Sequence, residues 1–164
     1  MYKIKLLILL LISYTVTSCA SVDNKEKIKL SVGYISGEYE GLLLSNKLKS
    51  NLNNFGMLDN NSKYEIRANI SHSQNLYITN IDNTSDRERV TSSVQINIFD
   101  NKLSCNTHSF TETMSQFYVL ASSDKFISNK SAFEKIKSDN TEYFVRKFIN
   151  NLTLNDLLCE QITR

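Results

Sequence analysis

The segment Cys105-Asn106-Thr107-His108 combines residue types that could hold a metal ion. Residues three apart on a strand point to opposite faces, so one ion could bind Cys105 and His108 only across a β-bulge. The other histidine, His72, also lies in a strand-like stretch, where a partly buried or hydrogen-bonded role is the commoner one. We therefore expect both histidines to be structural, with no metal site.

Catalysis has equally little support in the sequence. Neither a nucleophile–base pair nor a glycine-rich phosphate loop is evident. Gly33, Gly37 and Gly41 fall where a strand connects to a helix, and small residues serve turns there. A pair of carboxylates that meets only on folding would not be visible. The sequence predicts no catalytic residue and no cofactor, and we expect a protein that is not an enzyme.

Cys19 is placed for a different chemistry, the attachment of lipid. A cationic start leads into an apolar run over residues 6–12, which polar residues from Ser13 onward interrupt before it could span a membrane. Val16-Thr17-Ser18-Cys19 then matches the bacterial lipobox, whose cysteine is diacylated and becomes the first residue. We expect residues 1–18 to be a signal peptide that is removed. The alternative is an ordinary signal peptide with a chance cysteine.

The lipid would hold the mature chain on a membrane without crossing it. Residues 19–26 are then the lipidated cysteine and a polar tether. In bacterial lipoproteins an Asp directly after the cysteine favours the inner membrane, and this chain has Ala20 there. The expected location is the outer membrane, facing the periplasm or the lumen of a partner barrel.

Cys105 and Cys159 remain in a compartment that permits disulfides. The sequence allows either a disulfide or two small, partly buried thiols. Cys159 lies in a C-terminal tail, residues 153–164, to which we assign no role.

Size and charge exclude other classes. Removing residues 1–18 from the 164 leaves 146, enough for one domain with a single core. Lys3 and Lys5 account for the excess of 19 basic over 17 acidic residues, so the mature chain is balanced. No nucleic-acid partner is expected, because such binders carry a basic footprint.

Hydrophobic periodicity predicts six elements. Alternation of apolar and polar residues indicates four strands, and recurrence every three or four residues indicates two helices, with Gly56 at the C′ position of the first. Asp100-Asn101 predicts a tight hairpin turn, and a change of apolar parity after Cys105 predicts a bulge. In chain order, the expected elements are a strand over 28–34, a helix over 39–55, a strand from 64 that continues toward 78, a loop over 80–86, a strand over 90–98, a strand over 103–116 and a helix over 131–152.

The last helix is expected to begin at a capping box, with Ser131 as the cap and Glu134 reaching back. Phe144 and Phe148 belong to its apolar stripe. The order β-α-β-β-β-α predicts an α+β fold: a single domain over residues 27–152, with two helices packed on one face of a largely antiparallel four-stranded sheet.

Three basic residues need separate weighing. Arg87 and Arg89 lie where the loop enters the third strand, and Lys130 precedes the last helix. They are either ordinary solvated side chains or an anion site, because Arg offers bidentate contacts and Lys a point charge. We expect the three to lie at one end of the sheet and to converge.

These features together resemble the lipopolysaccharide-assembly lipoprotein LptE family. The resemblance rests on the lipobox, the element order, Arg87-Glu88-Arg89-Val90, Phe99-Asp100 and the segment from Tyr118 to Phe126, and it covers roughly residues 27–152. It implies a plug inside the outer-membrane β-barrel LptD that helps to deliver lipopolysaccharide to the outer leaflet.

The resemblance also implies a role for the basic residues, as contacts to lipopolysaccharide made by Arg87, Arg89 and Lys130. The alternative is an envelope lipoprotein with a structural or transporter-accessory role and no lipopolysaccharide contact.

Overall fold

The computed structural model describes residues 28–78, 86–120, 126–152, 157 and 159. The predicted signal peptide, the lipid site at Cys19, the tether and most of the tail lie outside these residues. The elements are β1 (Ser31–Ser36), α2 (Glu38–Asn54), β2 (Tyr64–Ile78), β3 (Asp86–Asp100), β4 (Cys105–Val119) and α3 (Phe126–Leu152).

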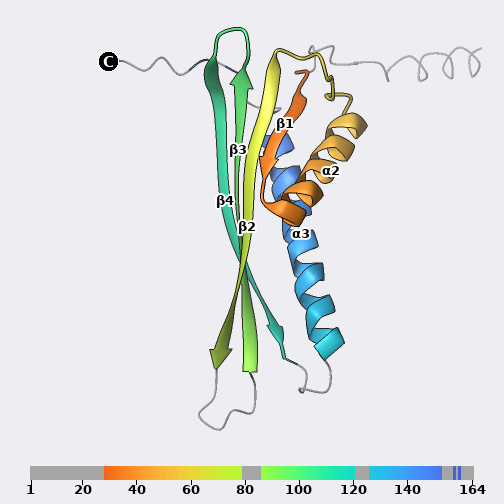
Figure 1. Ribbon diagram of the computed structural model, residues 1–164, viewed down its shortest axis with the longest axis vertical. Coiled ribbons are helices and arrows are strands. Elements are labelled where there is room, and N and C mark those ends of the chain that lie inside the picture. The colour runs from red at the N-terminus through yellow and green to blue at the C-terminus, as the bar shows by residue number, and fades with distance from the viewer. Residues whose placement is uncertain (1–27, 79–85, 121–125, 153–156, 158, 160–164) are drawn as a thin grey trace, which may run out of the picture.

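The strands form one sheet in the order β1-β2-β3-β4. β1 runs parallel to β2, and the other two pairs are antiparallel. Both helices lie on one face of the sheet, α2 over β1 and β2 and α3 over β3 and β4 (Figure 1). The predicted α+β fold with the order β-α-β-β-β-α is confirmed.

The core lies between this face and the helices, where the apolar positions of each element meet. Phe144 and Phe148 are fully buried, as the stripe on the last helix predicts. The side chains with the largest buried volume also include Leu30, Leu44, Leu48, Leu52, Ile66, Ile96, Ile98, Ile149 and Leu152.

Two glycines have backbone conformations that other residues rarely adopt. Gly37 turns the chain from β1 into α2 with a φ of 110°, and a Cβ there would lie 2.8 Å from the carbonyl oxygen of Ile70. Gly56 follows α2 with a φ of 65°, which confirms its predicted C′ position.

The predicted start of the last helix is wrong. α3 begins at Phe126, so Ser131 and Lys130 lie within the helix instead of before it. Glu134 pairs with Lys137 at 3.0 Å and does not reach back to cap. The pattern misled because Ser-x-x-Glu matches interior helical spacing as well as a capping box.

The β3–β4 connection also differs from the expected tight turn at Asp100-Asn101. Residues 101–104 form the turn, because the Asp100 carboxylate accepts the backbone N–H groups of Lys102 at 2.8 Å and Leu103 at 3.0 Å. β4 runs from Cys105 to Val119 and not from 103 to 116.

The predicted bulge in β4 is present. Ile98 pairs with His108 and Phe99 with Asn106, which leaves Thr107 as the extra residue. Thr107 is buried, and its hydroxyl donates to the carbonyl oxygen of Ile98 at 3.1 Å.

Candidate functional site

The face of the sheet turned away from the helices is polar along most of its length, and we call it the open face. Its side chains alternate with the buried positions of β2, β3 and β4. The central part contains no charged residue. It comprises Asn69, Ser71, Ser73, Thr91, Ser93, Gln95, Asn97, Ser109, Thr111, Thr113 and Ser115.

Hydroxyl and amide groups on the open face pair across β3 and β4. The hydroxyl oxygens of Ser93 and Thr113 lie 2.7 Å apart, and those of Thr91 and Ser115 lie 2.9 Å apart. The Ser109 hydroxyl donates to Asn97 Oδ1 at 2.9 Å. Such groups keep further donors and acceptors for a ligand or partner. The surface can exchange its water contacts for other polar contacts without desolvating a full charge.

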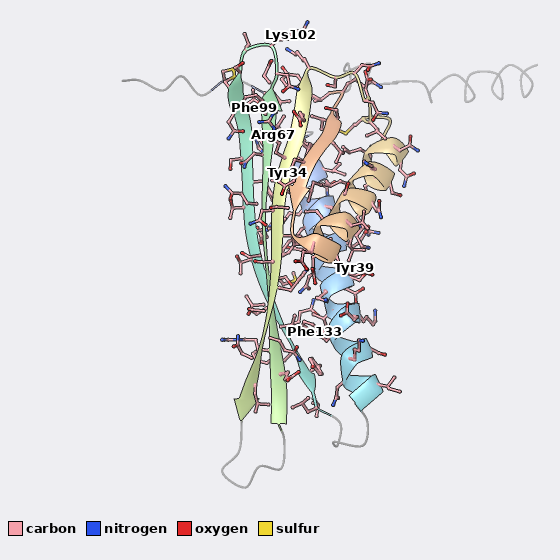
Figure 2. The ribbon with its side chains drawn as sticks, viewed as in Figure 1. Tyr34, Tyr39, Arg67, Phe99, Lys102 and Phe133 are labelled. Atoms are coloured by element: carbon pink, nitrogen blue, oxygen red, sulfur yellow. A yellow bond between two sulfur atoms is a disulfide. The ribbon has the colours of Figure 1, made fainter. Side chains whose placement is uncertain are left out.

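Charge is confined to the two ends of the open face. At the end nearest the β3–β4 turn, the Arg67 guanidinium lies 4.2 Å from the Phe99 ring centroid and 3.0 Å from Glu65 (Figure 2). The hydrogen bond from Arg67 lowers the pKa of Glu65. At the far end Arg87 and Arg89 are exposed beside Phe117 and Val119, their partners in β4.

The structure places Arg87, Arg89 and Lys130 at the same end of the sheet but does not make them converge. Arg87 and Arg89 alternate with half-buried Glu88 and buried Val90, so they lie on the open face. Lys130 lies on the helix side of the sheet. The expected single patch of three cations is therefore divided between two faces, because side chains alternate along β3.

Lys130 lines a small cavity of about 280 Å³ between the sheet and the first turns of α3. In this cavity Glu88 accepts hydrogen bonds from Gln74 and Tyr118. Burial and the bond to Glu88 raise the pKa of Tyr118 to about 12. The hydroxyl of Tyr118 therefore stays protonated and acts as a donor.

A buried polar network lies farther along the same face, beneath α3. Asn140 is fully buried and donates to Ser92 at 2.8 Å, while Gln116 donates to Asn140 at 2.6 Å. His72 Nδ1 lies 2.7 Å from the Ser92 hydroxyl. Burial lowers the pKa of His72, so the neutral ring is favoured.

Lys137, which lies one turn before Asn140, links α3 to α2. Its side chain is 8% exposed, and its ammonium lies 3.1 Å from Glu40 and 3.0 Å from Glu134. Burial alone would lower the pKa of Lys137, but the two carboxylates outweigh it and raise the pKa. The pKa of Glu40 is lowered by a backbone hydrogen bond and by Lys137.

Sequence reasoning missed Ser92, Gln116, Lys137 and Asn140. A signal was present: Lys137, Asn140 and Thr141 fall on the same helical stripe as Phe144 and Phe148. Polar residues on a stripe that faces the sheet indicate a buried polar network.

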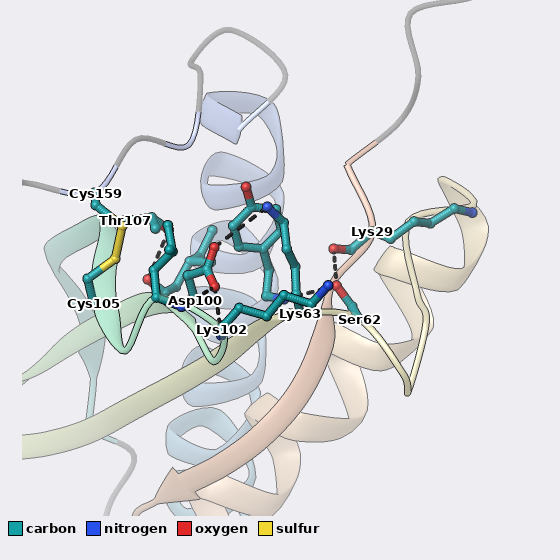
Figure 3. A network of polar contacts seen from close by, with 11 residues as sticks. Lys29, Ser62, Lys63, Asp100, Lys102, Cys105, Thr107 and Cys159 are labelled. Carbon is teal, nitrogen blue, oxygen red and sulfur yellow. Dashed lines mark hydrogen bonds and ion pairs between the residues drawn. A yellow bond between two sulfur atoms is a disulfide. The ribbon is translucent and has the colours of Figure 1, made fainter.

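Cys105 and Cys159 form a disulfide with a Cα–Cα distance of 5.9 Å (Figure 3). Nearby, the Lys63 ammonium lies 3.6 Å from the Asp100 carboxylate. Because of the bulge at Thr107, Cys105 and His108 lie on the same face of the sheet. The Cys105 sulfur is part of the disulfide, so it is not free to bind a metal ion. Within the described residues, no group of three His, Cys, Asp or Glu side chains could hold a metal ion.

The histidines have the structural roles expected of them. His108 lies against Phe148, with ring centroids 6.4 Å apart, and its Nε2 atom is buried without a hydrogen-bond partner among the described residues. Burial lowers the pKa of His108.

Among the described helices, none is long and apolar enough to cross a membrane.

No protein-family model matches the chain, and no curated protein matches it. Several solved structures share its fold, and two of them are lipoproteins. Rare lipoprotein B from Shewanella oneidensis is 10% identical with a TM-score of 0.55, over 76% of this chain and 96% of that one. A candidate lipoprotein from Caulobacter crescentus CB15 is 18% identical with a TM-score of 0.53, over 75% of this chain and 86% of that one. The chain is similar to both proteins in fold.

Proposed function

We propose that this chain is a lipid-anchored protein of the cell envelope whose domain plugs an outer-membrane β-barrel, as LptE plugs LptD, and assists lipopolysaccharide assembly. The observation that carries the proposal is the open face, a broad uncharged polar surface on a sheet with the fold of rare lipoprotein B. The analogy with LptE comes from the resemblance of the sequence to that family.

The lipid anchor is supported by the lipobox at Val16-Thr17-Ser18-Cys19. The names of the similar structures support it too, because both describe lipoproteins. Two acyl chains give stable membrane attachment where one does not. Residues 19–26 would then be the lipidated cysteine and a short tether, as their polar sequence predicts.

The open face suits the wall of a water-filled barrel. Its Ser, Thr, Asn and Gln side chains can pair with polar groups of the wall directly or through water. The central part carries no charge, so a partner can cover it without desolvating an ionised group. Among the described residues, both helices lie on the opposite face and none covers the open face (Figure 1).

Arg87 and Arg89 would contact lipopolysaccharide. Both lie at the end of the open face that is far from the β3–β4 turn. Their guanidinium groups can bind lipid A phosphates in a bidentate manner. Lys130 lies on the other side of the sheet, and we assign it a separate, weaker contact.

The first test is lipidation. Cys19→Ser should abolish labelling by a palmitate analogue, because a serine hydroxyl cannot form the thioether that holds the diacylglycerol. Ser18→Ala keeps a small residue before the cysteine and should label normally. Label retained by the Cys19→Ser protein would contradict the anchor.

The second test is the partner. Affinity purification of the wild-type protein from detergent-solubilised outer membrane should bring down a large β-barrel protein, identified by mass spectrometry. A lipidated protein that brings down no barrel would favour the alternative of an envelope lipoprotein without lipopolysaccharide contact.

The third test is the ligand. Arg87→Glu with Arg89→Glu should weaken lipopolysaccharide binding and leave the barrel complex intact. Lys102→Glu, an exposed cation at the opposite end of the sheet, is the matched control. Equal binding by the double variant and the control would remove lipopolysaccharide contact from the proposal.

A further inference from the structure

β4 is an edge strand of unusual length and little protection. It has 15 residues, and among the described residues no strand pairs with its outer side. Proteins usually protect such edges with Lys, Pro, bulges or short strands. β4 contains no Lys, Arg or Pro, and its one bulge lies near its start at Thr107. Among the described residues, the segment from His108 to Val119 is thus a regular edge that no strand covers.

The opposite edge is protected over part of its length. β1 has only 6 residues, and its register with β2 is interrupted between Val32 and Ile35. The chain then leaves the sheet at Gly37 and covers the core with α2. β1 pairs only with residues 65–69 of β2, so residues 70–78 of β2 form a second edge without a strand on its outer side among the described residues. β4 is the longer of these two edges.

Helix α3 provides a second surface beside this edge. Lys147 pairs with Glu112 of β4 at 2.8 Å, and Asn140 contacts Gln116. Tyr143 lies between these two contacts and is 40% exposed, with the Lys147 ammonium 5.7 Å from its ring centroid. An added strand along β4 would therefore run next to an exposed aromatic ring on α3.

The sequence of β4 is complementary to itself in one antiparallel register. With a twofold axis at Thr113, Thr113 faces its own copy, Thr111 faces Ser115, and Glu112 faces Met114. Hydroxyl groups thus oppose hydroxyl groups on the open face, a favourable cross-strand pairing. Tyr143 lies close to the level of this axis, so the two copies would cover each other's ring.

Neighbouring registers are poorer. An axis at Glu112 would place two carboxylates directly opposite each other, which is destabilising. An axis at Met114 would keep Thr113 opposite Ser115 but place Thr111 opposite Phe117, so two hydroxyl pairs would form instead of three. A two-stranded contact with a twofold axis also closes on itself, so it yields a dimer and not a fibre.

We propose that two copies of this chain pair antiparallel through β4 about Thr113, forming a continuous eight-stranded sheet with Tyr143 of each copy at the interface. The pairing forms when the protein is not held by another partner. It does not rest on the proposed function, because it uses the strand edge and not the centre of the open face.

Single cysteines test the register in the full-length protein purified in detergent. Thr113→Cys should form a covalent dimer with a short bismaleimide. Ser109→Cys should not react with itself, because its two copies would lie eight residues apart, about 27 Å at the rise of a strand. Ser109→Cys mixed with Phe117→Cys should cross-link, since this register places them opposite each other.

Charge substitutions provide a second readout in sedimentation equilibrium. Thr111→Lys with Ser115→Lys places like charges opposite each other twice and should weaken the dimer about tenfold. Thr111→Lys with Ser115→Glu places opposite charges there and should dimerise like the wild type. Both variants change the same exposed positions, so loss of folding would affect both.

Three results would overturn the proposal. The first is a wild-type protein that stays monomeric at every concentration. The second is equal association of the two charge variants. The third is cross-linking of Ser73→Cys on β2 in place of Thr113→Cys, which would move the contact to a different strand.

Discussion

Around α2 the core is built from aliphatic and aromatic side chains, whereas beneath the N-terminal half of α3 the same sheet is covered largely by polar ones. In the first region, the apolar half, Leu48, Ile66 and Phe148 are fully buried. In the second, the polar half, Ser92 and Asn140 are equally buried but are held by hydrogen bonds. Equal burial is thus achieved by two kinds of chemistry.

The difference separates stability from specificity. Apolar burial contributes roughly 25 cal/mol per Å², while a buried hydrogen bond contributes little net free energy and costs much when broken. The apolar half should therefore carry most of the free energy of unfolding. The polar half should fix how α3 lies over β3 and β4, because Asn140 satisfies its partners in one position only.

The largest expected effect is in the apolar half. Phe148→Ala should lower the free energy of unfolding by about 3–5 kcal/mol, because it leaves a cavity beside His108 and Phe110. Urea denaturation followed by circular dichroism measures the change. A midpoint close to that of the wild type would mean that the stripe on α3 is not the core of the domain.

The disulfide should come next. Cys105→Ser with Cys159→Ser opens a link between residues 54 apart in sequence and should cost about 2–4 kcal/mol. The same denaturation experiment, repeated under reducing conditions on the wild type, should give a similar loss. If neither treatment changes the midpoint, the disulfide contributes nothing to the free energy of unfolding.

A smaller loss is expected in the polar half. Asn140→Ala removes the hydrogen bonds that Asn140 makes with Ser92 and Gln116 and should cost about 1–3 kcal/mol. Asn53→Ala, at an exposed position of α2, is the control and should change stability by less than about 0.5 kcal/mol. Equal effects of the two substitutions would show that the network does not hold α3.

The smallest effect concerns pH. The pKa of His72 is lowered by burial and by Lys137, although Glu40 and Glu134 act in the opposite direction. The unfolded chain therefore binds a proton more readily than the folded one, and stability should fall as the pH drops below the ordinary histidine pKa. His72→Asn, which can still reach Ser92, should flatten this fall between pH 7 and 5.

Melting temperatures across that range check the pH effect. The lowered pKa of Glu40 acts at lower pH, since the stability it provides is lost as the pH falls through its folded value. The two contributions therefore occupy different windows. An unchanged slope in the His72→Asn protein would place the acid sensitivity elsewhere.

Periodicity alone predicted the element order, the faces of β2 and β3 and the stripe with Phe144 and Phe148. These features depend on the local spacing of apolar residues, which is visible in the sequence. Periodicity was wrong about the face of Tyr34 in β1, which is exposed because the register of β1 shifts after Val32. The bulge in β4 was also visible, because an extra residue changes the parity of the apolar positions. The start of α3 was not, since the capping pattern at Ser131 and Glu134 also fits the interior of a helix.

The candidate site was predicted less well. Arg87 and Arg89 were recognised as a pair, but their separation from Lys130 depends on which face of β3 each residue occupies. The pairing of β3 with β2 and β4 determines which face of the sheet Arg87 and Arg89 occupy. Their position after the loop does not determine it. The network around Asn140 depends on contacts between distant segments, which periodicity does not identify.

Photo-crosslinking in living cells tests the central claim most directly, namely that the open face meets a barrel. A photo-reactive residue at Thr111 or Ser73 should form an adduct with a large outer-membrane barrel, while one at exposed Lys49 on α2 should form less. An adduct with a second copy of this 18.8 kDa chain is distinguished by mass. If neither Thr111 nor Ser73 gives a barrel adduct, the open face is not a barrel-contacting surface.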